Sequence, residues 1–381
     1  MKVILAFPYS RAFVEKTVEG ISDYARQETN WRLTRFQEHQ SASLDWLRGW
    51  HGDGAFVTIG TAKDAEIARS LPFPVVNLAA YHVGEGVTTV TSDHRVIGRM
   101  AAEHLLERRF QRFGFYGATG LHYSQLRQEG FETAVRLHHG TCSVLEQGLH
   151  LDAMDSWVEQ EKALEQWLLS LVPPVAVMAC NDVRASLLIE ACHRLGLDIP
   201  GQIAVIGVDN DPMVQAHIQP SLSSVARQDH LAGEIAARKL TALMSKKVSP
   251  GELIYVEPTE VIARESTNIT AVDDPDFRLL ITDLQEHIGE GIGVDWLLEK
   301  TRWSRRSLEN RFREHLGEAP YSFINRLRMQ AASRLLKQQP DLSLSHVAAQ
   351  CGFSDLRHFR QAFRRFSNQS PAEYRDANPG D

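Results

Sequence analysis

Residues 344–366 of the chain read LSHVAAQCGFSDLRHFRQAFRRF. A short helical run ends near the aromatic Phe353, and Ser354 with Asp355 supplies the polar cap that opens a second helix. In this second helix Phe359 and Phe363 are four residues apart, which places both on one buried face. The stretch therefore predicts a helix-turn-helix unit.

A second unit with the same plan precedes it at residues 294–315, with Ser304 in the cap position. Sliding the chain by 51 positions superimposes Arg306 on Arg357, Leu308 on Phe359, Asn310 on Gln361, Phe312 on Phe363, Arg313 on Arg364 and Pro320 on Pro371. A self-match at a fixed period is typical of a duplicated supersecondary unit. The C-terminal part of the chain is therefore predicted to contain two helix-turn-helix motifs in tandem.

Each unit leaves a polar and mostly basic helix face once its apolar anchors are buried. The residues on these faces are Arg305, Arg306, Asn310 and Arg311 upstream, and Arg357, Arg360, Gln361 and Arg364 downstream. Arginine, asparagine and glutamine match the edges of bases in the major groove of DNA. An ordinary solvated face of a helical bundle is the alternative, but the repetition of cap and anchors at one offset favours DNA. Arg365 and Arg375 are expected to contact phosphates or to lie on the surface.

The same residues carry a family resemblance. Residues 277–381 resemble the DNA-binding domain of AraC-family transcription regulators, most specifically in Cys351–Ser354, Phe359, Phe363 and Ser370–Arg375. The resemblance implies that each unit places its second helix in a major groove of double-stranded DNA. It also implies that a long helix holds the two units apart, and Ser322–Gln338 has the length and periodicity for it.

The preceding residues, from Lys2 to about Val261, alternate short apolar runs with amphipathic stretches. The expected strands are Lys2–Phe7, Gly54–Ile59, Val75–Leu78, Phe113–Tyr116, Val175–Ala179, Ile203–Val208 and Ile254–Glu257. The expected helices are Phe13–Gln27, His94–Arg109, Gln125–His138, Trp157–Leu171, Arg184–Leu195 and His230–Ser245. This alternation predicts parallel sheets covered on both faces, and about 260 residues suit two such lobes.

Ligands of open α/β sheets bind beyond the carboxyl ends of the strands, so polar residues that follow strands are site candidates. They are Pro8–Arg11, Asn181 with Asp182, and Asp209 to Asp211. A local role is the alternative, because Asn and Asp also cap helices and shape turns. Asp182 and Asp93 both precede expected helices, so either could be a cap.

Residues 1–265 resemble the sugar-sensing effector domain of LacI/GalR-type repressors, a two-lobed, type I periplasmic-binding-protein-like α/β fold. Six pieces in the family's order carry the resemblance: 92–105, 126–131, 180–182, 196–200, 206–210 and 219–225. The resemblance implies that Arg127, Asp182 and Asp209 bind sugar hydroxyls, with Asn181 as a substitute for Asp182 and Asp93 as an extra contact. Hydroxyls both donate and accept, which suits a guanidinium fork beside carboxylates. Tyr9, Phe13, Tyr81 and Tyr123 could stack on the sugar, although most such aromatics are core residues.

The chain resembles bacterial xylose operon regulators, in which a sugar-sensing domain is followed by an AraC-type DNA-binding domain, called the reader below, and no helix-turn-helix lies at the N-terminus. This resemblance alone implies a pentose effector, D-xylose. The expected domains are 1–265, a polar linker at 266–276, and an all-α domain at 277–381. We expect a homodimer that activates transcription by RNA polymerase when sugar closes the lobes and re-aims the readers. Another sugar, repression in place of activation, or a non-regulatory sugar-binding protein are the alternatives.

Charge and composition agree with two different tasks. The chain has a net charge of −7, but residues 301–381 carry 14 Lys or Arg against 8 Asp or Glu, so the first 300 residues are strongly acidic. The sequence lacks a signal peptide, a membrane span and metal-ligand spacing among its four cysteines, which predicts a cytoplasmic protein without a cofactor or metal. It also lacks GxSxG, GxGxxG and P-loop motifs, so an enzyme is not expected.

Overall fold

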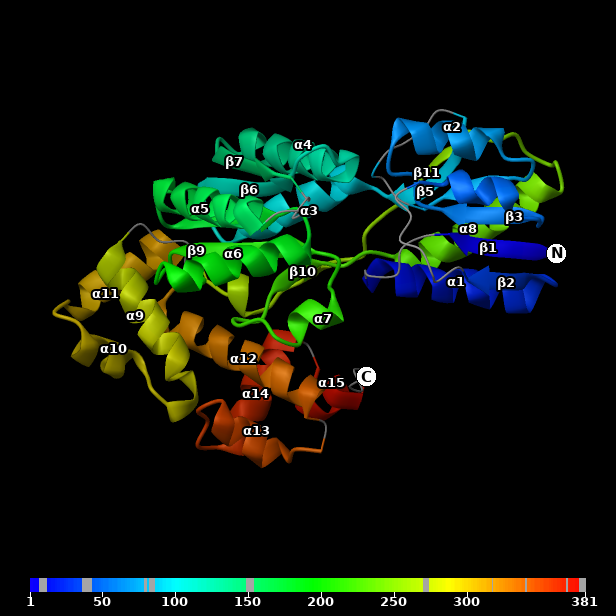
Figure 1. Cartoon of the computed structure of the whole chain (residues 1–381). Coiled ribbons are helices and arrows are strands. Elements are labelled where there is room, and N and C mark those ends of the chain that lie inside the picture. Colours follow the sequence, from blue (N-terminus) through cyan, green and yellow to red (C-terminus); the bar gives the residue numbers. More distant parts are fainter. Residues whose placement is uncertain are drawn as a thin grey trace. The chain divides into compact units, whose positions relative to one another are not determined.

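The computed structural model describes residues 1–6, 12–35, 43–78, 81, 86–148, 154–269, 274–316, 318–339, 341–367 and 369–376 (Figure 1). The chain divides into two compact units, Met1–Ala271 and Val272–Asp381. Within the described ranges, no helix combines the length and the apolar character needed to cross a bilayer.

The first unit contains two six-stranded sheets, one in each lobe. The first sheet has the order β11-β5-β4-β3-β1-β2, with all pairs parallel. Its strands are β1 Lys2–Ala6, β2 Arg32–Arg35, β3 Gly54–Val57, β4 Val75–Asn77, β5 Thr88–Ser92 and β11 Leu253–Val256. The second sheet has the order β12-β10-β9-β8-β6-β7, and β12 is antiparallel to β10. Its strands are β6 Arg112–Ala118, β7 Thr141–Gln147, β8 Val175–Ala179, β9 Ile203–Val208, β10 Ser223–Val225 and β12 Val261–Ile262.

Helices cover both faces of each sheet, as expected for parallel sheets. The first sheet packs α1 Ala12–Glu28 and α8 Asp229–Met244 on one face, and α2 Ala62–Ser70 with the 3-10 turn Asp45–Gly49 on the other. The second sheet packs α3 His94–Glu107 and α4 His122–Leu137 on one face, and α5 Met154–Ser170 and α6 Asp182–Arg194 on the other (Figure 1). The short helix α7 Pro212–Gln215 follows β9. The predicted two-lobed α/β fold is confirmed.

The second unit is helical. Its helices are α9 Pro275–Glu286, α10 Val294–Lys300, α11 Arg305–Arg311, α12 Pro320–Gln338, α13 Leu344–Gln350, α14 Leu356–Ser367 and α15 Pro371–Asp376. A π-helical turn, Phe312–Leu316, continues α11, and a 3-10 turn, Ile288–Glu290, follows α9. The predicted anchors are fully buried: Leu308 and Phe312 in one apolar cluster, Phe359 and Phe363 in another. Because α12 supplies Phe323 to the first cluster and Met329 to the second, it joins the two helix-turn-helix units.

The expected linker at residues 266–276 is shorter in the structure. Ser266 and Thr267 are buried in the first unit, and the Ser266 hydroxyl donates to the carbonyl of Val205 at 2.6 Å. At the other end, α9 already begins at Pro275, capped by the Asp274 carboxylate. Small polar side chains are typical of linkers, but here they bond to strands of the second sheet. Residues 270–273 lie outside the described ranges.

Candidate functional site

Arg127, on the inner side of α4, is the buried cation of the expected sugar site. Its side chain is 1% exposed. Its Nε donates to His94 Nδ1 at 3.2 Å, and Nη1 donates to the carbonyl oxygen of Cys180. The guanidinium also lies 5.0 Å from the centre of the Tyr123 ring. Burial and the Arg127 charge hold the pKa of His94 well below its usual value, so the imidazole is neutral and accepts this bond.

Asp209 directly follows β9 and lies beside two arginines. Its Oδ1 is 3.5 Å from Arg127 Nη2 and 3.2 Å from Arg227 Nη1. Its backbone φ of +108° is unusual for a residue other than glycine, and such strained positions often occur at functional sites. Arg127 and Asp209, two of the residues expected to bind sugar hydroxyls, are therefore neighbours in the structure.

Asp182, the first residue of α6, is buried beside the same turn. Its Oδ1 accepts from the Ser224 hydroxyl and its Oδ2 from the backbone N–H of Asp211, each at 2.8 Å. Gly207 leaves room for the carboxyl, because a Cβ there would overlap Asp182 Oδ1. Burial, followed by the neighbouring Asp209 carboxylate, raises the pKa of Asp182 to about 8. The carboxyl therefore retains a proton at neutral pH.

The sequence did not identify Arg227, which contacts three groups at this site. Its Nε donates to the Ser92 hydroxyl at 3.0 Å, and Nη2 lies 2.8 Å from Asp229, in addition to its bond with Asp209. It lies between β10 of the second sheet and α8 of the first, where the chain crosses between lobes. Its position two residues after a strand was the available signal, but that strand, Ser223–Val225, is too short and polar to recognise.

The remaining predicted residues of this site have local roles. Asn181 caps α6, with Oδ1 accepting from Arg184 N at 2.8 Å, and its Nδ2 donates to the Tyr123 hydroxyl at 3.1 Å. Asp93 caps α3 through two backbone N–H groups at 3.1 Å. Tyr81 packs edge-on against Tyr123, with centroids 5.7 Å apart. Pro8–Arg11, which include Tyr9, and the side chain of Phe13 lie outside what the structure describes.

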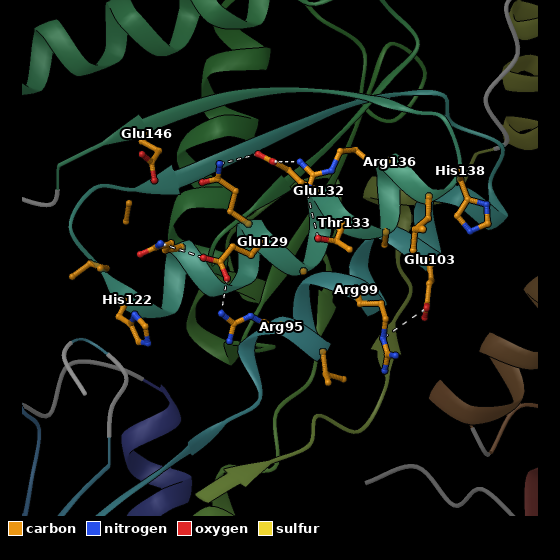
Figure 2. Close-up of a pocket in the computed structure, with 18 of the residues that line it drawn as sticks. Arg95, Arg99, Glu103, His122, Glu129, Glu132, Thr133, Arg136, His138 and Glu146 are labelled. Carbon is orange, nitrogen blue, oxygen red and sulfur yellow. Dashed lines mark hydrogen bonds and ion pairs between the residues drawn. The ribbon is translucent and has the colours of Figure 1, made fainter. Parts of the chain in front are cut away.

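A charged groove on the second lobe is a different feature. A groove of about 980 Å³ follows the outer surface of α3 and α4 and is lined by charged side chains (Figure 2). These pair with one another: Arg95 with Glu129 at 2.6 Å, Arg136 with Glu132 at 3.1 Å, and Arg99 with Glu103 at 3.8 Å. Its described lining does not include Arg127, Asp182 or Asp209. It is a solvated, charge-compensated surface and not the expected sugar site.

The outer face of α14 has the arrangement expected for a recognition helix. Phe359 and Phe363 are fully buried, whereas Arg357, Arg360, Gln361 and Arg364 are all exposed. The Asp355 carboxylate caps the helix by accepting from Arg357 N at 2.8 Å. This face therefore presents three guanidiniums and an amide, the groups that bind phosphates and base edges.

The outer face of α11 differs from the prediction at Arg311. Arg306 and Asn310 are exposed as expected, and Arg305 is exposed but pairs with Asp295 at 2.6 Å. Arg311 is half-buried: it forms an ion pair with Asp274 and lies 4.3 Å from the centre of the Trp303 ring. This side chain points toward the start of α9, so it packs against the domain. Arg313, which the sequence repeat aligns with Arg364, is exposed.

Comparisons with known proteins agree with this architecture. A periplasmic binding protein-like domain model matches residues 102–267, and a helix-turn-helix domain model matches residues 297–377. The xylose operon regulatory protein of Escherichia coli (strain K12) is 29% identical over 99% of this chain and 97% of its own length. That of Haemophilus influenzae is 26% identical over 98% of each chain.

A solved structure agrees over the same extent. The structure of a xylose-binding transcription activator matches 99% of this chain and 98% of its own, with a TM-score of 0.72 and 27% identity. These relatives are named as transcription regulators and not as enzymes. The chain therefore combines a periplasmic binding protein-like domain with a helix-turn-helix domain that follows it, and it is similar over nearly its whole length to the xylose operon regulatory proteins.

Proposed function

We propose that the effector domain binds a pentose, D-xylose, and that this binding activates transcription from a promoter occupied by the reader. The observation that carries the proposal is the convergence of Arg127, Asp182 and Asp209 at the carboxyl ends of neighbouring strands β8 and β9. The choice of sugar rests on the relatives, two named for the xylose operon and one described as xylose-binding.

The chemistry of the cluster suits a polyhydroxylated ligand. A sugar hydroxyl donates one hydrogen bond and accepts others, so it needs both kinds of partner. Arg127 and Arg227 supply donors, the Asp209 carboxylate supplies acceptors, and the protonated Asp182 carboxyl supplies both. A ligand that lacks one hydroxyl leaves a buried group unpaired, at a cost of about 1–3 kcal/mol. The site can therefore discriminate between sugars that differ at one position.

The same proposal includes a homodimer and contact with RNA polymerase. One reader has two exposed recognition faces, on α11 and α14. Two readers on repeated half-sites would bind much more tightly, because the second binding event becomes intramolecular. An activator must also reach polymerase in the cytoplasm, where bacterial promoters are transcribed.

Calorimetric titration of the full-length protein with D-xylose, L-arabinose, D-ribose and D-glucose tests the proposal. We expect D-xylose to bind most tightly and to saturate one site per chain. Saturable binding of a different sugar would correct the effector while leaving a sugar-responsive regulator. No binding of any of the four would contradict a sugar-sensing role for this cluster.

A further inference from the structure

The segment that leaves the effector domain is firmly attached to the second lobe. Ser266 Oγ accepts from Ser223 N at 2.8 Å, and Thr267 Oγ1 lies 2.7 Å from Ser223 Oγ and 2.8 Å from His104 Nε2. Arg108 Nε donates to the carbonyl of Thr267 at 2.8 Å. We call residues 264–268 the exit segment, because the chain leaves the domain through it. Any change in the second lobe at these contacts is therefore passed to the end of the domain.

Arg264 begins the exit segment and connects it to the turn that carries Asp209. Its Nη2 donates to Asn210 Oδ1 at 2.6 Å, and Nη1 donates to the carbonyl of Leu222 at 2.7 Å. Its own backbone N–H donates to Ser223 Oγ at 2.7 Å. The Arg264 side chain therefore connects Asn210, the residue after Asp209, to the exit segment.

The turn at residues 209–211 is built to have a limited number of conformations. Asp209 and Asn210 have backbone φ values of +108° and +48°, which residues other than glycine seldom adopt. Asn210 N donates to Ser224 Oγ at 2.9 Å, and Asp211 N donates to Asp182 Oδ2 at 2.8 Å. The turn is therefore hydrogen-bonded to one proposed sugar ligand, Asp182, and begins with another, Asp209. A ligand that alters either carboxylate also alters the position of the Asn210 side chain.

We infer that Arg264 is the positioning residue that couples occupancy of the Asp209 and Asp182 site to the exit segment and, through it, to the reader. The inference rests on the proposed sugar-binding function. Coupling requires that the ligand favour one arrangement of a two-state element, and the Asn210–Arg264 contact is that element. Arg264 is not one of the proposed sugar ligands.

The test uses thermodynamic reciprocity. If sugar changes the affinity for DNA by some factor, bound DNA changes the affinity for sugar by the same factor. The D-xylose Kd of the full-length protein is therefore measured without DNA and with a duplex selected from a random pool by the protein. We expect the ratio of the two Kd values in the unaltered protein to be about 5–150, the usual range of allosteric coupling.

Arg264→Ala and Asn210→Gly should bring this ratio close to one, while the Kd without DNA changes much less. Glycine suits the positive φ of Asn210, so this variant removes the acceptor without straining the turn. Asn210→Asp keeps an oxygen acceptor for Arg264 and should retain the ratio. Arg238→Ala, which removes an exposed arginine paired only with Glu234 among the described residues, is the matched control. Melting temperatures without sugar identify any variant that fails to fold.

An unchanged ratio in both Arg264→Ala and Asn210→Gly would overturn the inference. A ratio of one in the unaltered protein would also overturn it, with sugar binding itself intact. Absence of D-xylose binding in the unaltered protein is a separate result, because it rejects the proposed effector and not only the coupling route.

Discussion

Arg127 Nη2 and Asp209 Oδ1 lie 3.5 Å apart, although one residue is on helix α4 and the other follows strand β9. Arg227 approaches the same carboxylate oxygen at 3.2 Å from a third part of the chain. The charges of the proposed sugar site are therefore paired with one another. Because the three side chains hold each other in position, each of them should affect the affinity for the sugar.

Replacing either carboxyl should remove sugar binding without removing DNA binding. Asp182→Ala and Asp209→Ala each delete partners of buried groups, and an unpaired buried group costs about 1–3 kcal/mol. We expect calorimetry to detect no binding of D-xylose, or binding at least about tenfold weaker, which corresponds to 1.4 kcal/mol. Glu129→Ala removes a carboxylate from the outer surface of α4 and should leave the affinity unchanged. Unaltered affinity in Asp182→Ala or Asp209→Ala would refute the assignment of that residue.

Asp182 should make the stability of the effector domain depend on pH. Its pKa rises from 3.8 to about 8 on folding, mainly because it is buried, so the folded state binds its proton more tightly than the unfolded state does. This contribution is fully present below about pH 4 and is lost as the pH rises through about 8.

Asp182→Asn cannot ionise. Its stability relative to the unaltered protein should therefore increase as the pH rises from about 4 to about 8, by an amount on the order of 2–5 kcal/mol. Thermal unfolding of both proteins between pH 5 and about 8.5 measures the difference. A constant difference in melting temperature would mean that Asp182 is ionised throughout this range.

Arg357 and Arg365 should differ in how they affect DNA recognition. Both are exposed on α14, but Arg357 is expected to face base edges and Arg365 a phosphate. Arg357→Ala should lose about 1–3 kcal/mol and relax the preference at one base pair. Arg365→Ala should weaken binding to every sequence by a similar factor. Selection from a random duplex pool distinguishes the two, and equal losses on specific and random DNA in Arg357→Ala would show that the helix register is wrong.

Arg311 and Arg306 form a second contrasting pair, within α11. Because Arg311 binds Asp274 and lies on Trp303, Arg311→Ala should lower the free energy of unfolding of the reader by about 0.5–2 kcal/mol. Its sequence preference should stay the same. Arg306→Ala should do the reverse, changing the preference with little change in melting temperature. A loss of DNA affinity confined to one base-pair position in Arg311→Ala would instead support the base contact that the sequence predicts.

The sequence predicted the elements that have a regular apolar pattern and missed those that do not. Strand β5, Thr88–Ser92, is fully buried, yet four of its five residues are threonine or serine. Strand β10 has two serines among three residues. A hydrophobic pattern cannot identify such strands, because most of their buried side chains are hydroxyls that are hydrogen-bonded to other groups. Arg227, which follows β10, was missed for the same reason.

Contacts that the sequence did not predict have a similar origin in the tertiary structure. Arg311 is predicted to contact DNA because its helix is basic, but in the structure it forms an ion pair with Asp274 at the start of α9. Ser266 and Thr267 are predicted to be linker residues because they are small and polar, but in the structure they form hydrogen bonds with β9, β10 and His104. By contrast, the tandem helix-turn-helix units were predictable, since their caps and anchors interact within each local motif.

Footprinting of the full-length protein on the promoter it controls, with and without D-xylose, tests the central claim most directly. If sugar in the effector domain controls the reader, D-xylose should extend or shift protection so that both half-sites are occupied. The change should disappear in Asp209→Ala while basal protection remains. Identical protection of both half-sites with and without D-xylose would contradict control of the reader by sugar.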